Sequence, residues 1–521
     1  MSILIPPASG VIVRMYKQGL GDCFLLAFPT GQPGQAYYML IDCGVVLGTS
    51  DPQTIMTRVA NDIKDATGGD IHLLVATHEH WDHLSGFLQA RPVFDTLRIH
   101  NLWLAWTENP DDPLANQLRG EFKQSLTALR TAVNSASNPV AVQHITNLVQ
   151  FFGNPAAVAA PGNNASSSAG AGNTGDALQN LRGYVAKMQA TPQYRYPLKD
   201  PPLSLPSVNG LPNVSGIRLY VLGPPHDEQK LKDILPTAKG QETYKVPASG
   251  SALTALTTLL TSVVNQDQFS PQDRVLRERS LPFDQSVRIP PAEAKEHSFF
   301  HTYYGFNDES AVSSDDSTTR NSQPQNASAW RRIDDEYWLG AGAELALKLD
   351  SYTNNTSLAL AIELINSNKV LLFAADAQIG NWLSWDDLSW TVPDANDNTQ
   401  TIHIADLLAR TVLYKVGHHG SFNATVRGLG TVPKGLELMT SPDLVAMVPV
   451  DHQMALKKRW GQMPFDPLLQ RLRQKANFRV LRSHDDPYPL PKPDGMDDAT
   501  WQAFKANYEE SDLYMQYTVH G

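Results

Sequence analysis

The chain has 521 residues, of which 42% are hydrophobic, and its formal net charge at pH 7 is −11. This length exceeds one ordinary domain and supplies ample apolar material for a large buried core. No apolar run is long enough to span a bilayer, and the acidic balance argues against non-specific nucleic-acid binding by the surface as a whole.

Short apolar runs separated by glycine-rich turns characterise the N-terminal part of the chain. Residues 11–16, 23–28 and 37–41 are predicted strands, 51–65 a helix and 71–76 a buried strand. This alternation predicts an α/β layered architecture. Cys23 and Cys43 are the only cysteines and lie in apolar runs, so we expect buried free thiols. The first residues lack a signal-peptide pattern, and we therefore expect a cytoplasmic protein without membrane association.

Four metal-ligand side chains follow the strand at 71–76, and all fall within six residues. They are His78, His80, Asp82 and His83. Mixed imidazole and carboxylate donors suit zinc, manganese or iron better than calcium or magnesium. His78 and His80 can share one ion, whereas Asp82 and His83 can turn toward a second. A purely structural zinc site is disfavoured, because such sites favour cysteine-rich ligand sets.

The later chain alternates strands with two long insertions, at about 97–216 and 227–340. The first is predicted to contain a strand at 102–106, a helix at 117–152 and a flexible tract at 163–175, and the second a mobile polar tract at 307–326. Further strands are expected at 217–222, 358–362, 370–373, 412–416, 444–450 and 478–481. We therefore expect a core over residues 1–490 and a C-terminal extension over 491–521.

Two further motifs stand at predicted strand ends, where loops can reach the first cluster. Asp376 follows an apolar strand and can bridge two cations with its two oxygens. His418 and His419 follow the next such strand and precede Gly420 and Ser421. Together these residues complete the ligand count of a site for two ions, in which either histidine of the pair could be the ligand.

These motifs, in this order, resemble the metallo-β-lactamase superfamily, and within it the hydrolase domain of ComEC-type competence proteins. The stretches that carry the resemblance are Gly21–Leu26, Leu40–Gly44, His78–His83, Asn354–Leu358, Asp376 and His418–Ser421. The resemblance implies a four-layer αβ/βα sandwich interrupted by the two insertions. It also implies that Asp42 and Asp22 support the metal ligands from behind. We expect Ser421 and Asn355 to contact the substrate.

The chain departs from the family pattern at three places. Many members have a further histidine where this chain has Thr353-Asn354-Asn355, and His226, His297 or His301 would have to replace it. The usual glycine before the bridging aspartate is Ala375. Gln462 stands where relatives have the histidine of a Y-G-H-P motif. Without the missing histidine, His78, His80 and Asp376 still leave an open position, which is typical of a catalytic metal site.

The expected activity is metal-dependent hydrolysis by a hydroxide bound to one or two zinc or manganese ions. Asp82, His418 and His419 are the residues expected to take part in the chemistry as well as in metal binding. The resemblance implies a phosphodiesterase or nuclease acting on DNA or a nucleotide. A small carbon ester such as a lactone or thioester is the alternative substrate. A partly degenerate regulatory scaffold, binding a protein partner through the insertions, is the alternative of a different class.

Overall fold

A computed structural model describes most of the chain. The described residues are 3–135, 172–197, 199–233, 242–244, 296–299, 349–393, 398–429, 431–458, 460 and 462–521. The expected flexible and polar tracts at 163–175 and 307–326 fall largely or wholly outside these ranges, as does the part of the expected helix beyond residue 135.

The chain divides into two compact units. The first contains residues 1–123, 146–249 and 347–521, and the second contains 124–145 and 250–346. Of the second unit, the structure describes the end of helix α5 (Pro113–Ser135) and residues 296–299. All of the sheets belong to the first unit.

An eight-stranded mixed sheet forms one half of the first unit. Its strand order is β19-β20-β1-β2-β3-β5-β7-β8. The strands are β1 (Gly10–Tyr16), β2 (Cys23–Pro29), β3 (Ala36–Cys43), β5 (Leu73–Ala76), β7 (Leu102–Ala105), β8 (Gln193–Arg195), β19 (Tyr508–Glu510) and β20 (Tyr514–His520). From β3 to β8 the strands are parallel, so their carboxyl ends lie at one edge of the sheet.

A six-stranded sheet forms the other half, in the order β18-β17-β14-β11-β10-β9. Its strands are β9 (Ile217–Val221), β10 (Leu360–Leu364), β11 (Lys369–Phe373), β14 (Thr411–Lys415), β17 (Val445–Val448) and β18 (Val480–Arg482). The strands β11, β14, β17 and β18 are parallel. Loops that follow these strands therefore share one edge.

The two sheets pack face to face, with helices on their outer faces. Alternation along β2 sends Phe24 and Leu26 into the core between the sheets and Leu25 into the helix-covered core. Leu371 and Leu372 of β11 divide in the same way. The period of two in strand side chains thus builds three apolar cores from two sheets.

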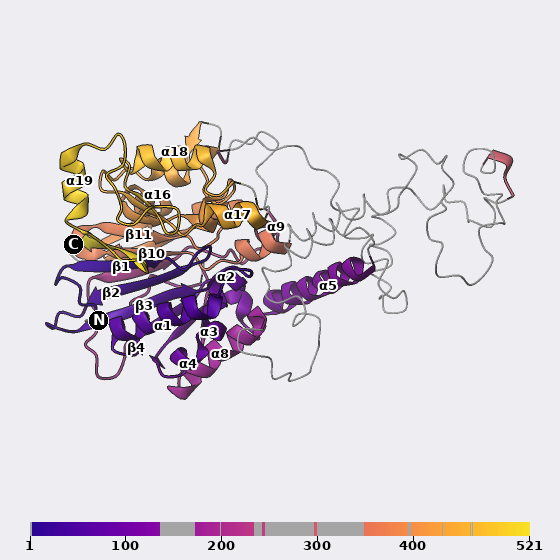
Figure 1. Cartoon of the computed structure of the whole chain (residues 1–521), viewed down its shortest axis with the longest axis horizontal. Helices are drawn as coiled ribbons and strands as arrows, with labels where there is room; N and C mark the ends of the chain where they lie inside the picture. The colour runs from indigo at the N-terminus through magenta and orange to yellow at the C-terminus, as the bar shows by residue number, and fades with distance from the viewer. Residues whose placement is uncertain are drawn as a thin grey trace. The chain divides into compact units, whose positions relative to one another are not determined.

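Helices cover both outer faces (Figure 1). Over the first sheet lie α1 (Pro52–Thr67), α3 (Gly86–Gln89), α4 (Arg91–Phe94) and α8 (Thr174–Lys187). Over the second lie α15 (Ile379–Ser384), α16 (Ile404–Ala409), α17 (His452–Lys458) and α18 (Asp466–Lys475). Also present are α2 (Trp81–Leu84), α9 (Glu228–Lys232) and α19 (Asp498–Lys505). The predicted α/β class is confirmed.

Two expected boundaries differ from the structure. Residues 491–521, expected as an extension, supply β19 and β20, and β20 pairs with β1 along its whole length. The expected insertion at 97–216 contains β7, β8 and α8, which complete the first sheet and its helical cover. The sequence did not show that these elements belong to the first sheet, because pairing between strands that lie far apart in the chain leaves no pattern in the local sequence.

Cys23 and Cys43 are buried free cysteines, and they occupy opposite positions on the neighbouring strands β2 and β3. Within the described ranges, no helix combines the length and apolarity needed to cross a membrane.

Candidate metal centre

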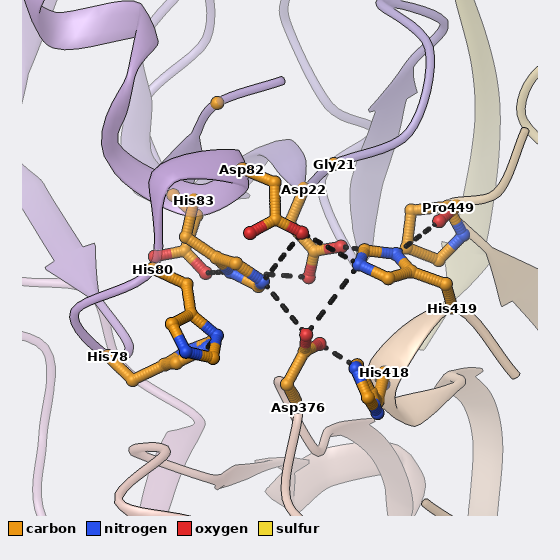
Figure 2. A network of polar contacts seen from close by, with 12 residues as sticks. Gly21, Asp22, His78, His80, Asp82, His83, Asp376, His418, His419 and Pro449 are labelled. Atoms are coloured by element: carbon orange, nitrogen blue, oxygen red, sulfur yellow. Dashed lines mark hydrogen bonds and ion pairs between the residues drawn. The ribbon is translucent and has the colours of Figure 1, made fainter. Parts of the chain in front are cut away.

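The predicted ligands converge where strands of the two sheets end. The loop after β5 carries His78, His80, Asp82 and His83, whereas Asp376 follows β11 of the opposite sheet. His418 and His419 follow β14, the parallel neighbour of β11. Figure 2 shows these side chains turned toward one another, with Asp376 reaching the cluster from the second sheet.

Four buried side chains form the tightest group. One ligand atom from each of Asp22, His83, Asp376 and His419 lies within 4.8 Å of the others, a set that could hold a metal ion. His83 Nε2 is 3.1 Å from Asp376 Oδ2. Asp82 adjoins the group, because its Oδ2 is 2.9 Å from His419 Nε2. Asp22, expected only to support ligands from behind, thus lies among them.

The rings of His83 and His419 are each held by the nitrogen that faces away from this group. His83 Nδ1 lies 2.8 Å from Asp42 Oδ2. His419 Nδ1 lies 2.7 Å from the carbonyl oxygen of Pro449. With Nδ1–H donating to these oxygens, each Nε2 points at the cluster and would offer its lone pair to a bound ion, the usual arrangement for a metal-binding histidine. Of the His418–His419 pair, His419 is the one that belongs to the group that could hold a metal ion.

His78 and His80 form a second pair beside His83 (Figure 2). His78 Nε2 is 3.0 Å from His80 Nδ1. The Nδ1 of His78 lies 3.1 Å from the hydroxyl of Thr77, which itself donates to Asp42. This chain of hydrogen bonds leaves a lone pair on the Nε2 of His78, the nitrogen that faces Nδ1 of His80.

One buried lysine neutralises part of the negative charge. The ammonium of Lys415 contacts Asp22 and donates to Asp376 Oδ1 at 3.2 Å and to the carbonyl of Ala375 at 2.7 Å. Burial disfavours its charged form, but Asp22 and Asp376 outweigh this and raise the pKa of Lys415. The sequence signal for this residue is a lysine at the end of an otherwise apolar strand.

The surroundings favour the protonated form of His83 and the neutral forms of His80 and His418. Although burial opposes the charge, Asp376, Asp22 and further carboxylates raise the pKa of His83 well above its usual range. Burial lowers the pKa of His80 to about 3 and that of His418 to about 4. Neutral imidazoles keep a lone pair for a metal ion.

The donor set fits bound cations. Five carboxylates at the site are buried, those of Asp22, Asp42, Asp82, Asp350 and Asp376, against the single ammonium of Lys415. Oxygens of three of them, Asp22 Oδ1, Asp82 Oδ1 and Asp350 Oδ1, have no hydrogen-bond partner in the described part of the chain. Buried carboxylates are costly unless they are paired or bind metal. Divalent cations would satisfy both the charge and the orphan oxygens.

Asn355 was expected to contact the substrate, but its side chain hydrogen-bonds the backbone of neighbouring loops. Asn355 is buried, its Oδ1 accepts from the backbone N–H groups of Gln378 and Asn381, and its amide donates to two carbonyls near α9. The hydroxyl of Ser357 accepts from the backbone N–H of Asp376 at 3.2 Å. These bonds hold the loop that presents Asp376 and leave Asn355 no group for a substrate.

His418 sits in a ring of polar side chains. Its Nδ1 is 2.9 Å from the hydroxyl of Ser421 and 3.3 Å from the amide of Gln378, and its Nε2 is 3.4 Å from Asn354 Nδ2. Its backbone N–H donates to Asp376 Oδ1 at 3.1 Å. Ser421 therefore lies at the site and contacts His418.

The histidines considered as replacements for the missing ligand lie elsewhere. His226 pairs with Asp112 at 3.0 Å and packs on Trp106. His297 is exposed, and His301 lies outside the described residues. Gln462 is exposed.

Four of the nine described non-glycine residues with positive φ angles lie at the centre. Asp42, Ala375, His418 and His419 all have positive φ angles, of 54°, 49°, 39° and 53°. Ala375 occupies the position where the family pattern has glycine, and it adopts the left-handed conformation that glycine favours. Such strain is typical of positions whose geometry is fixed by function.

Comparison of the whole chain with protein-family models gives no match. Comparison with curated proteins also gives none. The function must therefore be argued from the site.

Proposed function

We propose that this protein is a metal-dependent hydrolase of the metallo-β-lactamase type, with phosphodiesters as its substrates. The observation that carries the proposal is the buried group of Asp22, His83, Asp376 and His419, joined by Asp82 and flanked by His78 and His80. The face-to-face sheets with outer helices support the same family arrangement.

The residues would hold two neighbouring cations. His78 and His80 supply one position, and Asp82, His83 and His419 supply the other. Asp376 faces His83 with one oxygen, and its other oxygen lies at Lys415. Zinc or manganese suits these nitrogen and oxygen donors. When bound, such ions acidify a water molecule and stabilise charge on the ester oxygens.

The groups around this position hold the candidate ligands in place by hydrogen bonds and ion pairs. Asp42 and the Pro449 carbonyl fix the rings of His83 and His419, and Lys415 holds the carboxylates of Asp22 and Asp376. Asp82 has a pKa lowered to about 2, because His83 and His419 outweigh the effect of burial. As an ionised carboxylate it would hold a cation at neutral pH. His418, hydrogen-bonded within the site but outside the tight group, is placed to contact a substrate oxygen.

The phosphodiester assignment rests on the likeness of the ordered motifs to ComEC-type hydrolase domains. DNA and nucleotides are the two forms considered, and the net charge of −11 favours the smaller one. A scaffold without activity would have no use for a ligand set with strained backbone and buried carboxylate oxygens that have no partner among the described residues. Hydrolysis of a lactone or thioester is the outcome to consider if phosphodiesters are not cleaved.

The deciding experiment is hydrolysis of bis(p-nitrophenyl) phosphate by zinc- or manganese-loaded protein. Turnover should require the metal. In Asp376→Asn it should fall by more than the about 100-fold typical of residues that only support a ligand. The matched control is Asp512→Asn, because Asp512 is exposed and pairs with Arg58 on the surface.

The outcomes separate the candidates. Loss of turnover in Asp376→Asn but not in Asp512→Asn supports the proposal. No turnover by a protein that binds its metal would overturn the phosphodiester assignment, and the same variants would then be assayed with a lactone and a thioester.

A further inference from the structure

Where the pattern that the motifs resemble has a further histidine, this chain has Thr353-Asn354-Asn355, and Asp350 lies just before it. The described residues 349–355 are helical and lead into β10. Asp350 and Asn354 lie one turn apart on this helix. Asn354 Nδ2 lies 3.3 Å from Asp350 Oδ2 and 3.4 Å from His418 Nε2. This face of the helix is therefore turned toward the metal centre.

Asp350 reaches His80 from this helix. Its Oδ1 lies 3.7 Å from His80 Nε2, and its side chain is only 6% exposed. That oxygen has no hydrogen-bond partner among the described residues. A buried carboxylate in this position needs a donor or a cation.

Three other histidines of the centre show how an oxygen at one ring nitrogen orients the ring. His83, His419 and His78 each have one ring nitrogen against an oxygen, from Asp42, Pro449 and Thr77, and the other nitrogen turned inward. For His80 the inward nitrogen is Nδ1, 3.0 Å from His78 Nε2, and the outward nitrogen is Nε2. Asp350 Oδ1 lies on the side of this outward nitrogen, 3.7 Å away, in the place that an oxygen takes at the other three rings.

We propose that Asp350 is a positioning residue for His80. The Nε2–H of His80 donates a hydrogen bond to Asp350, so the Nδ1 lone pair is directed toward the ion that His80 would share with His78. A small rotation of the carboxylate shortens 3.7 Å to a hydrogen bond of about 2.9 Å. The first metal position then needs no third histidine, because Asp350 fixes the tautomer and orientation of one that is present. This inference rests on the metal site of the proposed function.

Metal affinity tests the inference without relying on turnover. Zinc affinity and stoichiometry are measured by competition with a chromophoric chelator for wild type, Asp350→Asn and Asp350→Ala. The asparagine keeps an oxygen acceptor, so its affinity should remain near that of wild type. The alanine should weaken the first zinc position by about 10- to 100-fold. Cobalt-loaded protein gives a second readout, because the visible bands of the ion should change in Asp350→Ala and be preserved in Asp350→Asn.

Each outcome decides the matter. Equal and strong losses in both variants would make Asp350 a direct ligand, since a neutral amide is a poor substitute for a carboxylate, and would overturn the positioning role. Wild-type affinity in Asp350→Ala would also overturn it. If wild type binds no zinc, both this inference and the proposed function fail. If zinc binds as expected but no ester is cleaved, only the proposed function fails. Thermal unfolding of each variant establishes that it is folded.

Discussion

At the scale of single residues, the orientation of each candidate ligand depends on the group that hydrogen-bonds its outward-facing atom. Asp42 accepts from the backbone N–H of Thr77 at 2.8 Å, from the Thr77 hydroxyl at 2.7 Å and from His83 Nδ1 at 2.8 Å. One carboxylate thus fixes the start of the ligand loop and the ring of a ligand. Its positive φ shows that the backbone is strained to place it there.

Replacing Asp42 with Asn should weaken metal binding. The asparagine amide can accept through only one oxygen, so His83 or Thr77 must lose its acceptor. We expect zinc affinity to fall by about 10- to 100-fold. Isothermal titration with zinc measures this, with Asp512→Asn as the control for loss of a carboxylate. An unchanged affinity for Asp42→Asn would mean that His83 does not need this carboxylate for metal binding.

At the scale of elements, close backbone approach fixes the ligand loop against β3. Gly44 follows β3, and a Cβ built there would lie 2.5 Å from the carbonyl oxygen of Asp82 and 2.6 Å from the backbone nitrogen of His83. The neighbouring Gly21, at φ +150°, would meet the same Asp82 oxygen at 2.6 Å. These glycines let two loops touch through their backbones.

A single added methyl group should therefore act oppositely at two glycines. Gly44→Ala must displace the backbone of Asp82 and His83, and we expect a loss of about 1–3 kcal/mol of stability together with weaker metal binding. Gly183→Ala is the matched control, because Gly183 is exposed within α8 and a Cβ there meets nothing within 4 Å. That change should stabilise the protein by about 0.4–1 kcal/mol.

Urea unfolding and zinc titration of both variants check this prediction. If Gly44→Ala binds zinc with wild-type affinity and is not destabilised, the loop and β3 do not approach as closely as described. The Gly183→Ala result separates the effect of the clash from any general effect of adding a methyl group.

The same scale shows why some features could be predicted from the sequence. Apolar strands at β1, β2, β3, β11 and β14 are visible because each is bounded by turns, and ligands at strand ends follow from short motifs. Lys415 and Asp350 could not be predicted as site residues, because neither belongs to a sequence motif and only the fold brings them to the site. Likewise, β20 pairs with β1 across nearly the whole chain, and local sequence contains nothing of that pairing.

At the scale of the first unit, the candidate metal centre draws its side chains from both sheets. His78, His80, Asp82 and His83 follow β5 of the eight-stranded sheet, whereas Asp376 and His419 follow β11 and β14 of the six-stranded sheet. Without a cation, the carboxylates brought together there repel one another. A bound ion replaces that repulsion with attraction and requires both sheets to be in place.

Metal binding should therefore stabilise both sheets together. At free zinc about 100 times above the dissociation constant, the apparent stability should rise by about 2.7 kcal/mol, and a chelator should remove this gain. Asp376→Asn should lose most of the response, because it breaks the link from the second sheet. Hydrogen exchange with and without zinc locates the effect. Protection should increase in the loop after β5 and also in the loops after β11 and β14. An increase confined to the loop after β5 would place the metal on one sheet alone, and the centre would then not couple the two halves of this unit.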